Sequence, residues 1–141
     1  MSHDDIYELH PQECWELMRA QELGRLAFNI IDELHITPIN YAVDGETVLF
    51  RTAAGSKLFG VELGGEVAFE IDEVEGDVAT SVVVRGRARR LEEDEEQRAE
   101  HVPLRPWLGS DKPFLVEIVP TEVTGRRYPI SRPWLQIRAA V

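Results

Sequence analysis

The chain has 141 residues and a formal net charge of −11, with 43% apolar and 29% charged residues. These proportions are those of a globular protein, and the length suits one domain over residues 1–141. The acidic balance argues against nucleic acid and anionic membrane surfaces as partners, because both bind basic patches. No apolar run approaches the roughly 20 residues that cross a bilayer. With no visible secretory signal and a single cysteine, Cys14, we expect a cytoplasmic location.

The first predicted element is an amphipathic helix over residues 11–22. Pro11 suits its first turn, and apolar residues then recur at helical spacing. Gly24 is expected to end the helix. Residues 1–10 before it are predicted to be a peripheral segment, as are residues 127–141 at the other end of the chain.

After Gly24 the apolar residues alternate with a period of two, which predicts strands. Asp44-Gly45 is a strong hairpin signal between two of them. Pro38 is expected to make its strand irregular, and Gly86 suggests a bend or a close backbone approach. The predicted strands cover residues 24–31, 35–43, 47–52, 66–72, 78–91 and 114–125.

The segments between the strands predict short helices over 56–63 and 92–100 and a proline-rich loop over 103–113. Hairpin-like connections between consecutive strands favour an antiparallel sheet that closes into a barrel. The predicted fold class is mainly β, within the α+β group. It consists of a six-stranded antiparallel barrel with an N-terminal helix and one or two short helices. A small barrel fills its interior with side chains, so the binding surface is expected outside.

The segment from Arg51 to Lys57 differs from its surroundings, because a strand ends there in a glycine turn and a helix begins at Ser56. Ser56 is a good N-cap, and the helix start directs free N–H groups and partial positive charge outward. Arg51 and Lys57 add two full charges. These features suit a cradle for a phosphate group. They equally suit an ordinary strand-to-helix turn with two solvated basic residues.

No arrangement of side chains in the sequence identifies a catalytic centre. The four histidines are scattered, with no Cys or His at ligand spacing, which predicts no metal site. Neither a Gly-x-Ser-x-Gly elbow nor a Gly-x-Gly-x-x-Gly turn is present. No carboxylate is isolated in an apolar run in the manner of a catalytic acid. Catalytic residues are therefore unassigned, and a bound cofactor is expected to carry any chemistry.

Five segments, in this order, resemble the pyridoxamine 5′-phosphate oxidase-like family of flavin-binding split barrels. The resemblance covers roughly residues 10–125 and is closest to short actinobacterial members, many without an assigned substrate. The segments are Leu23–Ala27, Thr37–Gly45, Leu49–Leu58, Val67–Glu70 and Ser81–Ala88.

The resemblance implies a homodimer with two FMN molecules in clefts between the subunits. Its ring-facing residues would be Pro38, Ile39, Asn40 and Tyr41, acting largely through backbone. The phosphate and ribityl end would be held by Arg51, Thr52, Ser56 and Lys57. The partner subunit would contribute Thr80 and Ser81. Because Arg51 and Thr52 point to opposite faces of an extended strand, only one of them is expected to reach the phosphate directly.

The resulting function prediction is an FMN-dependent oxidoreductase acting on a small molecule that the sequence does not identify. One alternative keeps the fold and binds F420 or haem. F420 carries a polyglutamate tail, which the net charge disfavours and a strip of Arg85, Arg87 and Arg89 on one strand face would favour. The other alternative is a non-catalytic flavin-binding or sensing module.

The C-terminal tail allows two interpretations. Three arginines, Arg126, Arg127 and Arg132, could bind a substrate phosphate, with Tyr128 and Trp134 offering stacking surface. Alternatively, the tail extends a strand and its arginines are solvated.

Overall fold

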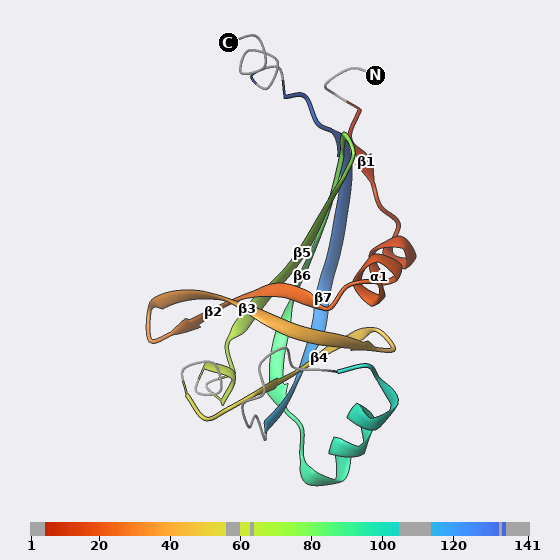
Figure 1. Ribbon diagram of the computed structural model, residues 1–141. Coiled ribbons are helices and arrows are strands. Elements are labelled where there is room, and N and C mark those ends of the chain that lie inside the picture. The colour runs from red at the N-terminus through yellow and green to blue at the C-terminus, as the bar shows by residue number, and fades with distance from the viewer. Residues whose placement is uncertain (1–4, 56–59, 63, 105–113, 133, 135–141) are drawn as a thin grey trace.

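A ring of six antiparallel strands forms the body of the protein (Figure 1). The computed structural model describes residues 5–55, 60–62, 64–104, 114–132 and 134. The order around the ring is β7-β4-β3-β2-β5-β6, and β6 pairs back onto β7. The six-stranded, mainly β barrel is therefore confirmed. Its strands are β2 (Leu23–Ile30), β3 (Glu33–Asp44), β4 (Thr47–Thr52), β5 (Glu66–Glu75), β6 (Val78–Arg90) and β7 (Phe114–Pro129).

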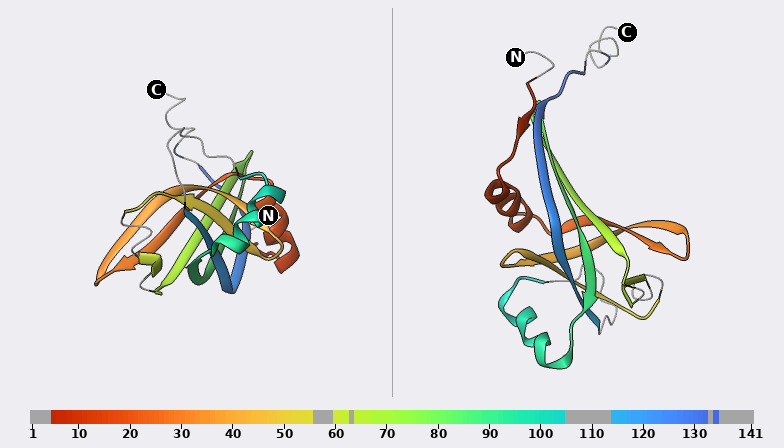
Figure 2. Two further views of the ribbon diagram at one scale, coloured as in Figure 1. Left: turned by 90° about the horizontal axis from the view of Figure 1, so that it is seen from below. Right: turned by 180° about the vertical axis from the view of Figure 1, so that it is seen from behind.

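Both predicted peripheral segments contribute to the sheet. A seventh strand, β1 (Tyr7–Glu8), pairs with Arg127 and Arg126 near the end of β7. Two residues are too few to show a period, so the sequence did not predict β1. β7 itself continues to Pro129, beyond its predicted end at Gly125. With the paired ends of β5 and β6 it forms a long arm that projects from the barrel (Figures 1 and 2).

The helices are short. α1 (Pro11–Arg19) ends before its predicted limit, because Glu22 already accepts a sheet hydrogen bond from Tyr41 N (3.0 Å). The predicted charged helix is a 3₁₀ helix, η1 (Glu93–His101). Residues 60–62 are helical, whereas 56–59 and 63 of the predicted helix and 105–113 of the predicted loop lie outside the described residues. None of the described helices is long and apolar enough to cross a membrane.

Two apolar clusters lie on opposite faces of the strands. The larger one fills the barrel and includes Tyr41, Phe50 and Phe69, with Cys14 and Met18 of α1 closing it. A smaller cluster lies outside the barrel, where η1 covers β4 and β7. Its buried members are Leu49, Leu91, Ala99 and Leu115.

Pro38 leaves β3 regular, contrary to the prediction. It lies opposite Arg25 in an unbroken β2–β3 ladder. The Tyr41 N–H bond to Glu22 O shows that odd-numbered residues of β3 direct their N–H groups toward β2. The Pro38 nitrogen therefore faces the other side, where pairing with β4 has already ended at Tyr41. A missing donor has no effect on the ladder there.

Gly86 lies at the irregularity between β6 and β7, as predicted. Arg85 pairs with Glu122 but Gly86 pairs with Pro120, so Thr121 is an extra residue in β7. A Cβ on Gly86 would lie 2.2 Å from the Val119 carbonyl oxygen, which only glycine avoids. Along the chain, the bulge changes the outward-facing residues of β7 from odd-numbered positions before Thr121 to even-numbered positions after it.

Candidate functional site

At the end of β4, Arg51 and Thr52 point to opposite faces of the strand, as expected, and the structure shows which of them faces outward. Thr52 points inward, is 2% exposed, and its Oγ1 donates to Ala53 O (3.2 Å). Arg51 is on the outer face, half-buried, and its side chain contacts no hydrogen-bonding or acidic partner in the described part of the chain. Arg51 is thus the member of the pair that a ligand outside the barrel can reach. Ser56 and Lys57, the other half of the predicted cradle, lie outside the described residues.

The predicted ring-facing residues of β3 also alternate between the two faces. Ile39 and Tyr41 point into the core, and Pro38 and Asn40 point outward. Tyr41 OH donates to Met18 O (2.6 Å), and its ring packs edge-on against Phe69. Burial raises the pKa of Tyr41, so the phenol is neutral. Any contact that Ile39 or Tyr41 makes with an external ligand must therefore use backbone atoms.

The structure brings these two groups of predicted residues to one place, where β3 and β4 part. Pairing between the strands runs from Asp44–Thr47 to Tyr41–Phe50 and stops. β4 then continues beside β7, and β3 continues beside β2. Residues 38–40 and 51–52 follow directly on the two sides of this parting.

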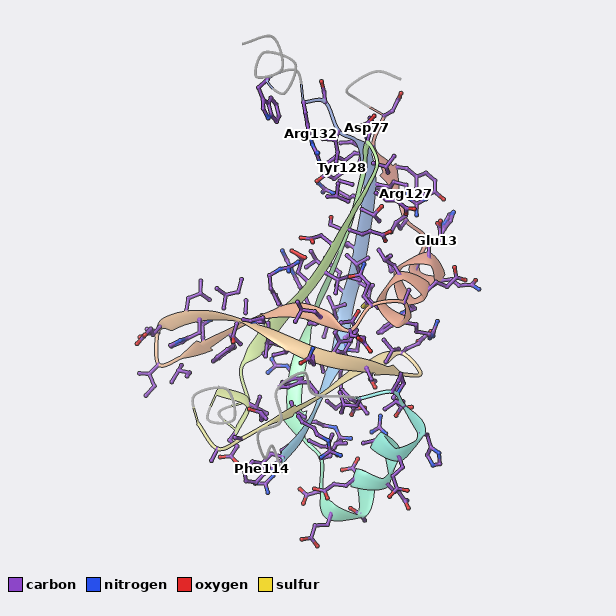
Figure 3. The ribbon with its side chains drawn as sticks, in the orientation of Figure 1. Glu13, Asp77, Phe114, Arg127, Tyr128 and Arg132 are labelled. Atoms are coloured by element: carbon purple, nitrogen blue, oxygen red, sulfur yellow. The ribbon has the colours of Figure 1, made fainter. Side chains whose placement is uncertain are left out.

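Thr80 and Ser81 lie far from that place. They pair with Arg127 and Arg126 in the arm, whereas Thr52 pairs with Phe114 at the start of β7. The twelve residue-to-residue steps from Phe114 to Arg126 span about 40 Å of extended strand. Figure 3 shows Phe114 and Arg127 at opposite ends of the molecule. Thr80 is buried and near Arg127 Nε (3.4 Å), and Ser81 is half-buried on the outer face.

The predicted basic strip on β6 is largely occupied by contacts within the chain. Arg87 donates to Gly64 O (2.9 Å), and Arg89 is held by Glu95 (2.6 Å) and Glu117 (2.9 Å). β6 has no free edge along this strip, because it pairs with β5 and β7. Only Arg85 of the three has no polar side-chain contact with a described residue.

Glu117 is the polar residue that the sequence analysis missed. It is 3% exposed and accepts hydrogen bonds from Arg89 and Arg98. Burial alone would raise the pKa of Glu117, but the hydrogen bond from Arg98 and the two guanidinium charges hold it below its ordinary value. Arg98 also binds Asp44 (2.8 Å), so the cluster fastens η1 to the β3–β4 hairpin. The signal was present, because Glu117 lies within the apolar run Leu115–Val119, although its lowered pKa is not that of a catalytic acid.

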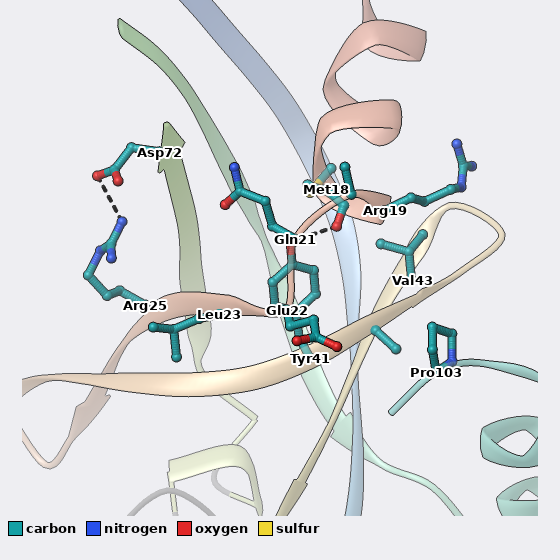
Figure 4. Close-up of a pocket in the computed structure, with 12 residues that line it drawn as sticks. Met18, Arg19, Gln21, Glu22, Leu23, Arg25, Tyr41, Val43, Asp72 and Pro103 are labelled. Carbon is teal, nitrogen blue, oxygen red and sulfur yellow. Dashed lines mark hydrogen bonds and ion pairs between the residues drawn. The ribbon is translucent and has the colours of Figure 1, made fainter. Parts of the chain in front are cut away.

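A hollow of about 720 Å³ opens between the end of α1 and strands β2 and β3 (Figure 4). Among the described residues, Tyr41 is the one predicted site residue that lines it. Arg25 at its edge binds Glu70 (2.5 Å) and Asp72 (2.8 Å), so its charge is already neutralised. The hollow adjoins the predicted ring-facing strand but offers no net charge to select a ligand.

The six-stranded ring that parts between β3 and β4 is a split β-barrel. The chain belongs to the pyridoxamine 5′-phosphate oxidase family, whose sequence profile matches residues 10–127.

Similar proteins include solved structures and curated relatives. A candidate pyridoxamine 5′-phosphate oxidase from Corynebacterium glutamicum is 38% identical, with 94% of this chain and 99% of that one aligned and a TM-score of 0.82. The FAD binding protein from Mycobacterium smegmatis is 37% identical, with 89% and 100% aligned and a TM-score of 0.76. An uncharacterized Mycobacterium tuberculosis protein, Rv3129, is 44% identical over 87 residues, which are 61% of this chain and 79% of the relative.

Proposed function

We propose that this protein binds a flavin nucleotide between two copies of the chain and serves as an FMN-dependent oxidoreductase for a small molecule. The observation that carries the proposal is the parting of β3 and β4, which leaves Arg51 on the outer face beside residues 38–40. Arg51 and the turn to Lys57 would hold the phosphate. The β3 backbone would lie along the ring.

The chemistry fits these residues. A guanidinium group binds phosphate through paired charged hydrogen bonds, and Arg51 has no described partner to give up. A bound flavin supplies hydride transfer at its N5, so the protein needs to bind, orient and shield rather than react. This accounts for a candidate site without an evident acid or base.

A second copy is part of the proposal, because the predicted residues of one chain cannot meet. Thr80 and Ser81 lie about 40 Å from the end of β4, measured along β7. In a two-fold dimer the arm of one subunit can reach the parted strands of the other, and each site is then shared.

FAD is a second candidate cofactor. The 37% identical relative from Mycobacterium smegmatis is named as an FAD binding protein. FAD contains the same flavin and first phosphate as FMN, so the same cradle would serve both.

The absorbance spectrum of the purified protein is the first test. Two visible bands indicate oxidised flavin, one band indicates deazaflavin, and a Soret band indicates haem. A colourless protein that takes up neither FMN nor FAD would refute the proposal.

The second test uses Arg51→Gln and Lys57→Ala, with Arg132→Gln as a matched control on an exposed arginine. We expect each of the first two to weaken FMN about tenfold, the value of one charged hydrogen bond. Riboflavin, which has no phosphate, should change little. Equal losses for FMN and riboflavin would show that these side chains do not contact the phosphate.

The third test addresses the shared site. Arg51→Glu damages the cradle, and Ser81→Trp damages the contribution of the partner. Each variant alone should lose FMN, whereas a refolded mixture should regain one intact site in each mixed dimer. No recovery in mixed dimers would indicate that each chain builds its site alone.

A further inference from the structure

A second hollow, of about 250 Å³, lies on the outer face of β6 and β7 in the arm. Its lining follows from the strand register. Ser81 lies opposite Arg126, Val83 opposite Thr124, and Arg85 opposite Glu122. Opposite side chains in such a pair start about 5 Å apart. Arg85 and Arg126 therefore stand at diagonal corners, with Val83 and Thr124 between them.

The two arginines of this hollow have no polar side-chain partner in the described part of the chain. Two carboxylates lie near these arginines without forming an ion pair with either of them. Glu122 lines the hollow beside Arg85, and Glu8 of β1 lies opposite Arg126, yet neither is within 4.0 Å of a guanidinium nitrogen among described residues. The hollow thus presents two positive charges and one negative charge.

Two acidic neighbours on β5 lie beside the hollow and share one arginine. Asp72 lies opposite Ser81, and Glu70 lies opposite Val83, on the same outer face. Both carboxylates are bound by Arg25 from the other side. The surroundings are therefore not positive overall, and what distinguishes the hollow is that its two guanidinium groups have no described polar partner for their N–H donors.

We propose that this hollow binds a phosphate group, held by Arg85 and Arg126 and by the hydroxyls of Ser81 and Thr124. Guanidinium groups match the geometry of phosphate oxygens, and each hydroxyl adds a donor that can rotate toward the ligand. Val83 forms the apolar floor. This rests on the proposed function in one respect: Ser81 is expected to approach the flavin of the partner subunit. The phosphate then belongs either to the second half of a dinucleotide flavin or to a separate phosphorylated ligand.

The experiment measures binding of FAD, FMN and inorganic pyrophosphate by titration calorimetry to the full-length protein. The variants are Arg85→Gln and Arg126→Gln. Arg87→Gln is the control, because it shares the outer face but donates to Gly64 O rather than lining the hollow. We expect each hollow variant to weaken its phosphate ligand about tenfold and the control to leave it unchanged.

A loss for FAD without a loss for FMN assigns the hollow to the second phosphate of the dinucleotide. A loss for pyrophosphate alone assigns it to a separate phosphorylated ligand. Unchanged affinity for all three probes would overturn the proposal. If the parent protein takes up no flavin, the proposed function fails, and the pyrophosphate titration still decides the role of the hollow.

Glu122→Gln is a variant that is expected to increase rather than decrease the affinity for the phosphate ligand. Removing the one carboxylate that lines the hollow should tighten pyrophosphate or FAD about two- to fivefold, because like charges repel. Weaker or unchanged binding would contradict an anion in this position. A gain of affinity cannot come from a folding defect, so this variant keeps the test independent of stability.

Discussion

Two groups of arginines on the outer face of the barrel differ in what they contact. Near η1, Arg89 and Arg98 bind a carboxylate, Glu117, that is 3% exposed. In the arm, Arg85 and Arg126 have no acidic partner within ion-pair distance in the described part of the chain. Arg85 and Arg89 even lie on the same face of the same strand. The spacing in the sequence places Arg85 and Arg89 on one face of the strand, but it did not determine what each of them contacts.

The difference shows which arginines are structural and which are available for a ligand. A buried carboxylate must be paired, since an unpaired one is strongly unfavourable in a low-dielectric interior. An exposed ion pair contributes little, so leaving Arg85 and Arg126 without one has a small effect on stability. In this protein, the arginines that remain available for a ligand are therefore those that have no buried carboxylate to neutralise.

The largest effect is expected from Arg98→Ala. This change leaves Glu117 with one charged partner, Arg89, and also frees Asp44. Removing one side of a buried ion pair should lower the free energy of unfolding by about 3 kcal/mol. Urea unfolding monitored by tryptophan fluorescence measures it.

Arg132→Ala is the matched control for this change, since it removes the same atoms from an exposed position. Its effect should stay within about 0.5 kcal/mol. If Arg98→Ala were equally mild, the Glu117 cluster would not hold η1 in place.

Gly86→Ala should have the next largest effect, and it acts at the boundary between the two groups of arginines. Its Cβ would meet backbone atoms of Val119 and Pro120, which cannot rotate away. Overpacking of this kind costs about 1–3 kcal/mol. Gly65→Ala is the control, because nothing lies within 4 Å of its added Cβ. Similar thermal unfolding of the two variants would show that the bulge adapts easily.

Local features of the sequence predicted most of the fold. Alternation and the Asp44-Gly45 turn placed β4 at Thr47–Thr52, the limits that it has in the structure. The contacts of the arginines could not be predicted in this way. Arg89 meets Glu117 because β7 returns beside β6 with a bulge at Thr121, and Arg98 meets it because η1 folds back.

The candidate site was predicted less completely than the fold. The opposite faces of Arg51 and Thr52 followed from strand geometry alone. The separation of Ser81 from Arg51 depends on strand pairing along the arm, which no local pattern encodes. Glu117 in its apolar run was visible in the sequence, but its partners were not.

Lowering the pH is expected to have a smaller effect on stability, and only through the carboxylates that pair with Arg89 and Arg98. Hydrogen bonds from Arg89 lower the pKa of Glu95 to about 2, and the pKa of Glu117 is also lowered. A carboxyl whose pKa falls on folding stabilises the protein above its unfolded pKa of about 4.3 and loses that contribution as pH falls through the folded value. The stability advantage of the parent over Glu117→Gln should therefore narrow as the pH falls from about 6 to about 3. A constant difference across that range would contradict the lowered pKa.

The smallest effect on stability is expected from changes to Arg85 and Arg126, the two arginines that are proposed to bind a phosphate. Arg85→Gln and Arg126→Gln remove charges that have no described polar partner, so each should change the free energy of unfolding by less than about 0.5 kcal/mol. Because Glu8 lies opposite Arg126 and Glu122 lies opposite Arg85 without an ion pair, any residual effect should diminish with added salt. Urea unfolding at low and high salt measures both quantities. A loss as large as that of Arg98→Ala would mean that the arm arginines are structural after all, and the contrast between the two groups would disappear.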